Sequence, residues 1–116
     1  MQPTTERLIQ QRLAADPVWA AHPVGQLARR MLDNGVPVTP VAQYLGVAGV
    51  VLRRWLYGYG GQTYYPGGRI AARAEMLEKI GVLCRIIDLA WRLDRLQEPW
   101  LDNFKQTETS LQPNVL

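Results

Sequence analysis

The sequence of 116 residues predicts a single all-α domain. Apolar residues recur at intervals of three and four along several segments, which is the spacing of helices that bury one face. Proline and glycine stand at the ends of these segments, where helices commonly begin and stop. Hydrophobic residues make up 47% of the chain, which is enough for one small core. We therefore expect one domain over residues 1–104 and a disordered polar tail over residues 105–116.

Two amphipathic helices are predicted in the N-terminal third. The first covers about residues 4–15, begins at threonine caps and stops at Asp16-Pro17. The sequence VWAAHP, residues 18–23, leads to the second helix, which covers about residues 24–34 and stops at Asn34-Gly35. Both should turn their apolar stripes toward one core.

Two short helices joined by a glycine are predicted next. Thr39 can cap the first, with Pro40 in its first helical position, so this helix covers residues 40–45. Gly46 turns the chain, and the second short helix covers about residues 47–57.

A loop rich in tyrosine and glycine leads to a long helix. The loop, residues 57–69, holds four of the five tyrosines and five of the ten glycines. It can form a small wing around a QTYY strand, a surface that stacks unpaired bases, or an Ω-loop packed over its neighbouring helices. The long helix covers residues 69–97 and ends at Glu98-Pro99.

The pair of short helices carries a specific pattern of apolar and small residues. Ala42 is small where two helices would cross, Gly46 occupies the turn, and Gly58 follows the second helix. The apolar positions of the pattern are Val41, Leu45, Val47, Leu52 and Trp55. This pattern resembles the helix-turn-helix of phage repressor and Cro-like DNA-binding proteins, and the helix over residues 24–34 fits that family's first helix. The alternative is an ordinary pair of helices with a glycine turn.

The resemblance implies that the second short helix enters the major groove of DNA. A rotation of about 100° per residue turns Val47, Val51, Leu52 and Trp55 inward. The residues on the outward face and its flanks are Ala48, Gly49, Val50, Arg53, Arg54 and Tyr57. Glutamine, asparagine, serine and threonine are absent from this face, so direct readout of bases would be sparse.

The distribution of charge favours a polyanionic partner. Residues 34–74 contain no aspartate or glutamate, and their four basic residues are Arg53, Arg54, Arg69 and Arg73. The remaining nine basic residues are outnumbered by ten acidic ones, so the net charge of +3 originates in the middle of the chain. We therefore expect double-stranded DNA as partner, with Arg69 and Arg73 as further contacts.

The long helix is apolar on more than one side. A helix of this kind must be buried on several sides, and a small chain has little else to cover it, so we expect a symmetric homodimer. The predicted interface residues are Leu77, Ile80, Leu83, Cys84, Ile87 and Trp91. The alternative is a monomer whose N-terminal helix covers the other side.

The residue inventory predicts no enzyme, no metal site and no cofactor. The chain holds one cysteine and one histidine, which leaves zinc, Ser-His-Asp and Cys-His chemistry without the residues they require. No apolar run is long enough for a membrane span, and the first residues lack the apolar core of a secretory signal, so a cytoplasmic protein is expected.

These patterns predict a transcriptional regulator of bacterial or phage type, acting as a repressor that binds DNA as a dimer. The sparse readout face favours a different class, a protein-binding module such as a phage-encoded inhibitor of a host protein. A third hypothesis is the DNA-recognition subunit of a phage packaging or replication complex. The lack of acidic residues over residues 34–74 favours DNA.

Overall fold

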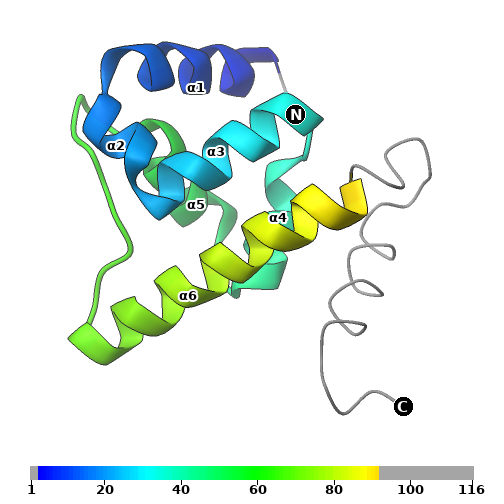
Figure 1. Cartoon of the computed structure of the whole chain (residues 1–116). Coiled ribbons are helices and arrows are strands. Elements are labelled where there is room, and N and C mark those ends of the chain that lie inside the picture. Colours follow the sequence, from blue (N-terminus) through cyan, green and yellow to red (C-terminus); the bar gives the residue numbers. More distant parts are fainter. Residues whose placement is uncertain (1–2, 92–116) are drawn as a thin grey trace.

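The structure is a computed structural model that describes residues 3–91 (Figure 1). Its elements in chain order are α1 (Pro3–Ala15), α2 (Pro17–Ala21), α3 (Pro23–Asn34), α4 (Val38–Leu45), α5 (Gly49–Tyr57), α6 (Ile70–Ile86) and a π-helical turn (Ile87–Trp91). Within residues 3–91 there is no β-strand, only an isolated bridge between Tyr59 and Gln62. The all-α prediction is therefore confirmed for this part of the chain.

Helix α3 forms the centre of the fold. It contacts α1, α2, α5 and α6, and α1 and α6 lie on opposite sides of it in Figure 1. Its apolar residues recur at helical spacing, and Leu27, Ala28 and Met31 are fully buried. The core gathers around them and includes side chains from every one of the six α-helices.

Helix α2 is a short helix in a segment where the sequence predicts only a connection between two longer helices. The Asp16 side chain accepts a hydrogen bond from the Trp19 backbone N–H at 3.0 Å, and Pro17 occupies the first helical position. An acidic cap followed by proline is a helix-start signal, although the sequence pattern around Asp16-Pro17 predicts only the end of the preceding helix. The helix places Trp19 in the core, fully buried.

The starts of α4 and α5 differ from the prediction by two residues each. Helix α4 begins at Val38 after Pro37, so Thr39 lies inside the helix and does not cap it. Helix α5 begins at Gly49, because Ala48 has an extended backbone conformation and takes the cap position. The turn prediction is confirmed, since Gly46 has a φ of 72°, a conformation that glycine adopts without strain.

The tyrosine and glycine loop forms no wing in the structure. Backbone hydrogen bonds between Tyr59 and Gln62 close a tight turn, and the QTYY segment pairs with no strand in the described part of the chain. Pro66 is buried, and the ring of Tyr65 lies 4.5 Å from the ring of His22. The loop therefore packs over the helices, as in the Ω-loop alternative.

Helix α6 begins at Ile70, one residue after the predicted start. It changes to a π-helical turn at Ile87, and the remainder of the predicted helix, to residue 97, lies outside the described residues. The expected tail over residues 105–116 also lies outside them.

Candidate nucleic-acid interface

The inner face of α5 is fixed by hydrogen bonds to its C-terminal end. The Trp55 carbonyl would accept the Tyr59 N–H if the helix continued, but that N–H donates to Gln62 in the loop. Instead, Arg12 Nη1 and Trp19 Nε1 donate to the Trp55 carbonyl at 2.9 and 3.2 Å. Helices α1 and α2 thus hold α5 in place, and the Arg12 cation lies at the end of α5 where positive charge is favourable.

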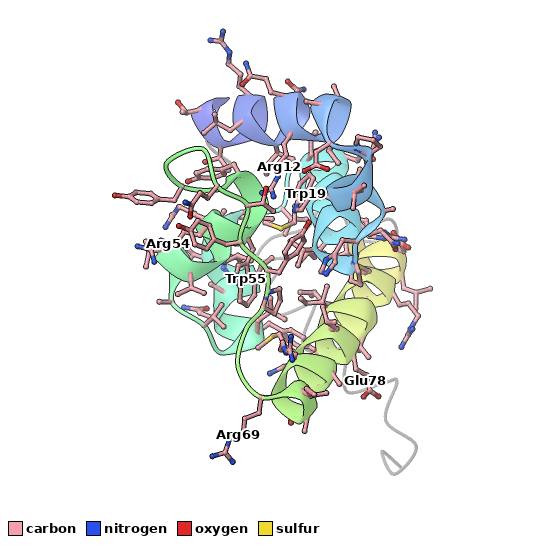
Figure 2. The ribbon with its side chains drawn as sticks, turned by 90° about the vertical axis from the view of Figure 1, so that its left-hand side faces the viewer. Arg12, Trp19, Arg54, Trp55, Arg69 and Glu78 are labelled. Atoms are coloured by element: carbon pink, nitrogen blue, oxygen red, sulfur yellow. The ribbon has the colours of Figure 1, made fainter. Side chains whose placement is uncertain are left out.

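The two side chains that donate to the Trp55 carbonyl also stack on each other. The Arg12 guanidinium lies 4.1 Å from the centre of the Trp19 ring, a cation–π geometry (Figure 2). Burial lowers the pKa of Arg12, Asp16 opposes this effect, and an arginine remains protonated throughout the physiological range.

The outer face of α5 carries the small apolar residues and the arginines that the sequence places there, but Tyr57, which is also expected on this face, is partly buried and packs against the core. Val50 is 54% exposed, Ala48 and Arg54 are also exposed, and Gly49 and Arg53 are partly exposed. Leu52, Trp55 and Leu56 are the buried residues of this helix. The structure thus directs a small apolar surface and two arginines away from the core.

Gly49 makes room for an arginine on the same helix. The Nη1 atom of Arg53 lies 3.0 Å from the position that a Cβ of residue 49 would occupy. Ala48 provides no side-chain cap, so the first N–H groups of α5 remain for solvent or a ligand. A guanidinium beside an uncapped helix N-terminus creates positive potential, which suits a phosphate group.

Tyr59 also belongs to this surface, although no helical pattern in the sequence predicts it. It is 66% exposed, and the Arg54 guanidinium lies 5.2 Å from the centre of its ring. The tight turn after α5 brings the ring back toward the helix, and the Gly58 conformation, with a φ of 81°, allows that turn. In the sequence, the feature that indicates this contact is Gly58, the glycine directly after α5.

Arg69 and Arg73 lie at the start of α6, and both are exposed. Figure 2 shows Arg54 and Arg69 directed away from the core, one on α5 and the other at the far end of the loop. Within residues 3–91 the ion pair between Arg30 and Asp88, at 3.1 Å, involves neither of them. No carboxylate of the described chain neutralises the arginines of residues 53–73.

The structure corrects the predicted dimer interface. Ile80, Leu83 and Ile87 are at most 1% exposed, and Cys84 is 6% exposed, because α3 covers this face of α6 within one chain. Burial raises the pKa of the Cys84 thiol, which disfavours the reactive thiolate. Leu77 is partly exposed, and the side chain of Trp91 lies outside the described part. Four of the six residues are thus core residues.

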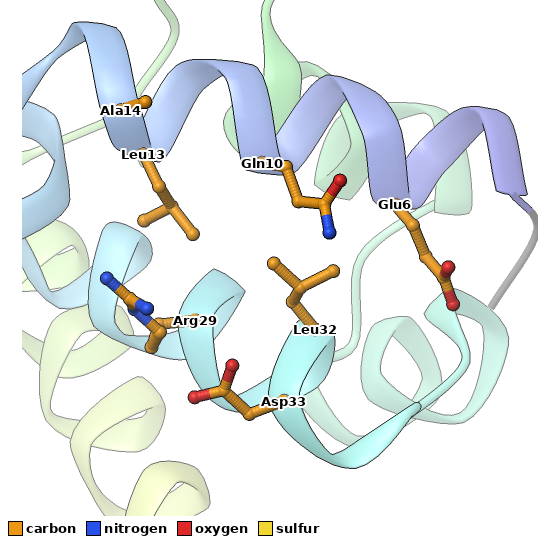
Figure 3. A pocket seen from close by; sticks show the side chains of 7 residues that line it. All are labelled: Glu6, Gln10, Leu13, Ala14, Arg29, Leu32 and Asp33. Carbon is orange, nitrogen blue, oxygen red and sulfur yellow. The ribbon is translucent and has the colours of Figure 1, made fainter.

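A groove of about 500 Å³ lies between α1 and α3 (Figure 3). Leu13 and Leu32 line it together with Gln10, and charges of both signs surround them: Glu6, Asp33 and Arg29. Two carboxylates at this groove oppose the binding of a phosphate. Between residues 3 and 91 no group of acidic, histidine or cysteine side chains could hold a metal ion, and no helix has the length and apolar character of a membrane span.

His22 connects the tyrosine and glycine loop, residues 57–69, to the helical core. Its Nδ1 atom accepts the Val24 backbone N–H at 3.1 Å and caps α3, while its ring contacts Tyr65 of the loop. Because Nδ1 is the acceptor, the neutral ring carries its proton on Nε2. Protonation of Nδ1 would replace the acceptor with a donor and remove the cap.

We expect the protein to lose stability as the pH falls below about 7. Burial lowers the pKa of His22, so the unfolded chain binds a proton more readily than the folded one. The contribution of His22 is complete above its unfolded pKa of about 6.5 and declines as the pH falls from there to the folded pKa. Urea denaturation across this range measures the effect.

The matched control is His22→Asn, which can still cap α3 and does not titrate. The protein has only one histidine, so the wild-type decline near pH 6 should be absent in this variant. An equal decline in both proteins would show that another group is responsible.

Comparison with known protein families, with curated proteins and with solved structures finds no match to this chain.

Proposed function

We propose that the protein is a DNA-binding transcriptional regulator of bacterial or phage type. One observation carries the proposal: residues 34–74 lack acidic side chains, and their arginines at positions 54, 69 and 73 are exposed without an ion pair in the described chain. Arginine suits phosphate because its planar guanidinium donates two parallel hydrogen bonds. Positive field over this surface would attract duplex DNA and supply most of the affinity.

The proposed mode of binding places α5 in the major groove. Helices α4 and α5 would act as a helix-turn-helix packed on α3, with α4 across the phosphate backbone. Val50 would meet a thymine methyl group, and Arg54 a guanine edge or a phosphate. The uncapped start of α5 beside Arg53 would receive a phosphate. Few bases would be read directly, so sequence preference would depend partly on DNA shape.

As a regulator, the protein would act by occlusion. A dimer bound to a pseudo-palindromic site, with half-sites about one helical turn apart, would block a promoter. This part of the proposal requires a second copy of the chain.

The arginines provide the test. We expect the logarithm of the affinity for duplex DNA to fall linearly with the logarithm of the salt concentration, with a slope of about 0.9 for each phosphate contact. Arg54→Ala and Arg69→Ala should each reduce that slope by about one. Arg7→Ala is the matched control, because Arg7 is an exposed arginine on α1, outside residues 34–74. Binding that does not depend on salt, or an equal effect of all three substitutions, would contradict the proposal.

A protein-binding module is a second candidate because two large apolar side chains on this surface are exposed. Val50 at 54% and Tyr59 at 66% place apolar surface beside Arg54, and protein interfaces are enriched in tyrosine and arginine. Under this hypothesis the same face of α5 would contact a host protein, and salt would affect that affinity less steeply than it affects DNA binding.

A further inference from the structure

One side of α6 is apolar and is only partly covered within the described chain. Ile70, Ala74, Leu77 and Gly81 follow one another at intervals of four, three and four, so they form one stripe along the helix. This stripe lies roughly a quarter turn from the buried face that carries Ile80. Its exposed part, at Ile70 and Ala74, is therefore distinct from the core contact around Ile80.

The stripe is open to solvent at Ile70 and Ala74, whereas Leu77 is partly buried and packs against the edge of the core. Ile70 is 78% exposed, Ala74 is exposed, and Leu77 and Gly81 are partly exposed. No atom lies within 4 Å of the position that a Cβ of Gly81 would occupy. Figure 1 shows the first turns of α6 extending past the other helices, and all residues from 70 to 75 are exposed. A partner that covers such an exposed isoleucine removes its apolar surface from water, which stabilises the complex.

Charges on the two edges of the stripe identify its partner. With Ile70 and Leu77 at heptad position d, Arg73 takes position g and Glu78 takes position e of the next heptad. Both side chains belong to the described part and neither forms an ion pair there. In two parallel helices, a g residue faces the e residue five positions later on the other helix, so Arg73 would face Glu78 of the second copy, and the reverse. An antiparallel pair would bring the two Arg73 side chains to one edge, where they would repel each other.

We infer that α6 pairs in parallel with α6 of a second copy of this chain through Ile70, Ala74, Leu77 and Gly81. The inference deepens the proposed function, because it supplies the interface of the dimeric regulator, but its test needs no DNA. The contact covers about two heptads with two small residues, so the dimer is weak and depends on concentration. The core residues of α6 stay buried in each copy and take no part.

Sedimentation equilibrium of the full chain without DNA tests the inference. We expect a monomer–dimer equilibrium in which Arg73→Glu and Glu78→Arg each weaken association by about tenfold or more, because each creates two like-charge contacts. The double variant, Arg73→Glu with Glu78→Arg, restores opposite charges and should return to within about threefold of the wild type. Arg7→Glu is the control, since Arg7 is an exposed arginine on α1, on the opposite side of α3 from α6.

Ile70→Glu tests the apolar stripe without disturbing the core, because Ile70 is 78% exposed. It should abolish the dimer and leave the circular dichroism spectrum and the free energy of unfolding unchanged. A wild-type chain that stays monomeric up to about 300 µM, or a double variant that fails to recover, would overturn the inference. If the protein is a monomer and still binds DNA, only the inferred pairing through α6 is wrong. If it is a dimer that does not bind DNA, only the proposed DNA-binding function is wrong.

Discussion

Gly25→Ala is expected to destabilise the protein by about 3 kcal/mol or more. Gly25 is a buried residue in the first turn of α3, directly against the backbone of α2. A Cβ at this position would overlap the Trp19 carbonyl oxygen and lie 2.8 Å from the Ala20 Cα. Backbone atoms cannot move aside as a flexible side chain can, so α2 would have to separate from α3. The midpoint of urea denaturation measures the loss.

The same substitution at Gly81 is the matched control. Gly81 lies inside α6, and no atom is within 4 Å of its Cβ position. Alanine is the better helix former by about 1 kcal/mol, so Gly81→Ala should leave stability unchanged or raise it. A similar response at both positions would show that α2 and α3 do not approach as closely as the structure indicates.

Trp19→Ala is expected to cost about 3–5 kcal/mol of folding free energy. The Trp19 side chain is fully buried, stacks under Arg12 and donates to the Trp55 carbonyl. Alanine would leave a large cavity at the junction of α1, α2 and α5 and would weaken the support behind α5. We expect DNA affinity to fall with the folded fraction, measured by circular dichroism and DNA titration on the same samples.

Trp19→Phe separates packing from hydrogen bonding. Phenylalanine retains most of the volume but donates no hydrogen bond, and Arg12 can still donate to the Trp55 carbonyl. The loss should be about 1–2 kcal/mol, clearly smaller than for alanine. Equal losses for both variants would mean that the hydrogen bond, and not the burial, carries the effect of Trp19.

Helical periodicity predicts most of the fold because each helix buries one face. The helices over residues 4–15 and 24–34 lie within one residue of their predicted bounds. Helix α2 has only five residues, too few for a periodic pattern, and its Asp16-Pro17 start doubles as the end of α1. The starts of α4 and α5 shifted because Pro37 and Ala48 cap by backbone conformation and not by a side chain.

The site is predictable where it depends on one helix and unpredictable where it depends on distant contacts. The outward face of α5 follows from the positions of Leu52 and Trp55 on the same helix. The hydrogen bond from Arg12 to Trp55 joins residues 43 apart, and no local pattern indicates it. The error over the dimer interface has the same origin. The apolar residues of α6 around Ile80 require a partner, and only the tertiary structure shows that α3 supplies it.

Site-specific photo-crosslinking tests whether the outer face of α5 contacts DNA. A photoreactive amino acid at position 50 replaces a valine that is 54% exposed on α5, and the matched control at position 18 replaces a valine that is 76% exposed on α2. With duplex DNA at low salt, we expect a covalent adduct from position 50 and none from position 18. The absence of a DNA adduct at position 50, or equal adducts at both positions, would show that the outer face of α5 is not a specific DNA contact. A protein adduct from host extract at position 50 without DNA binding would favour the protein-binding module.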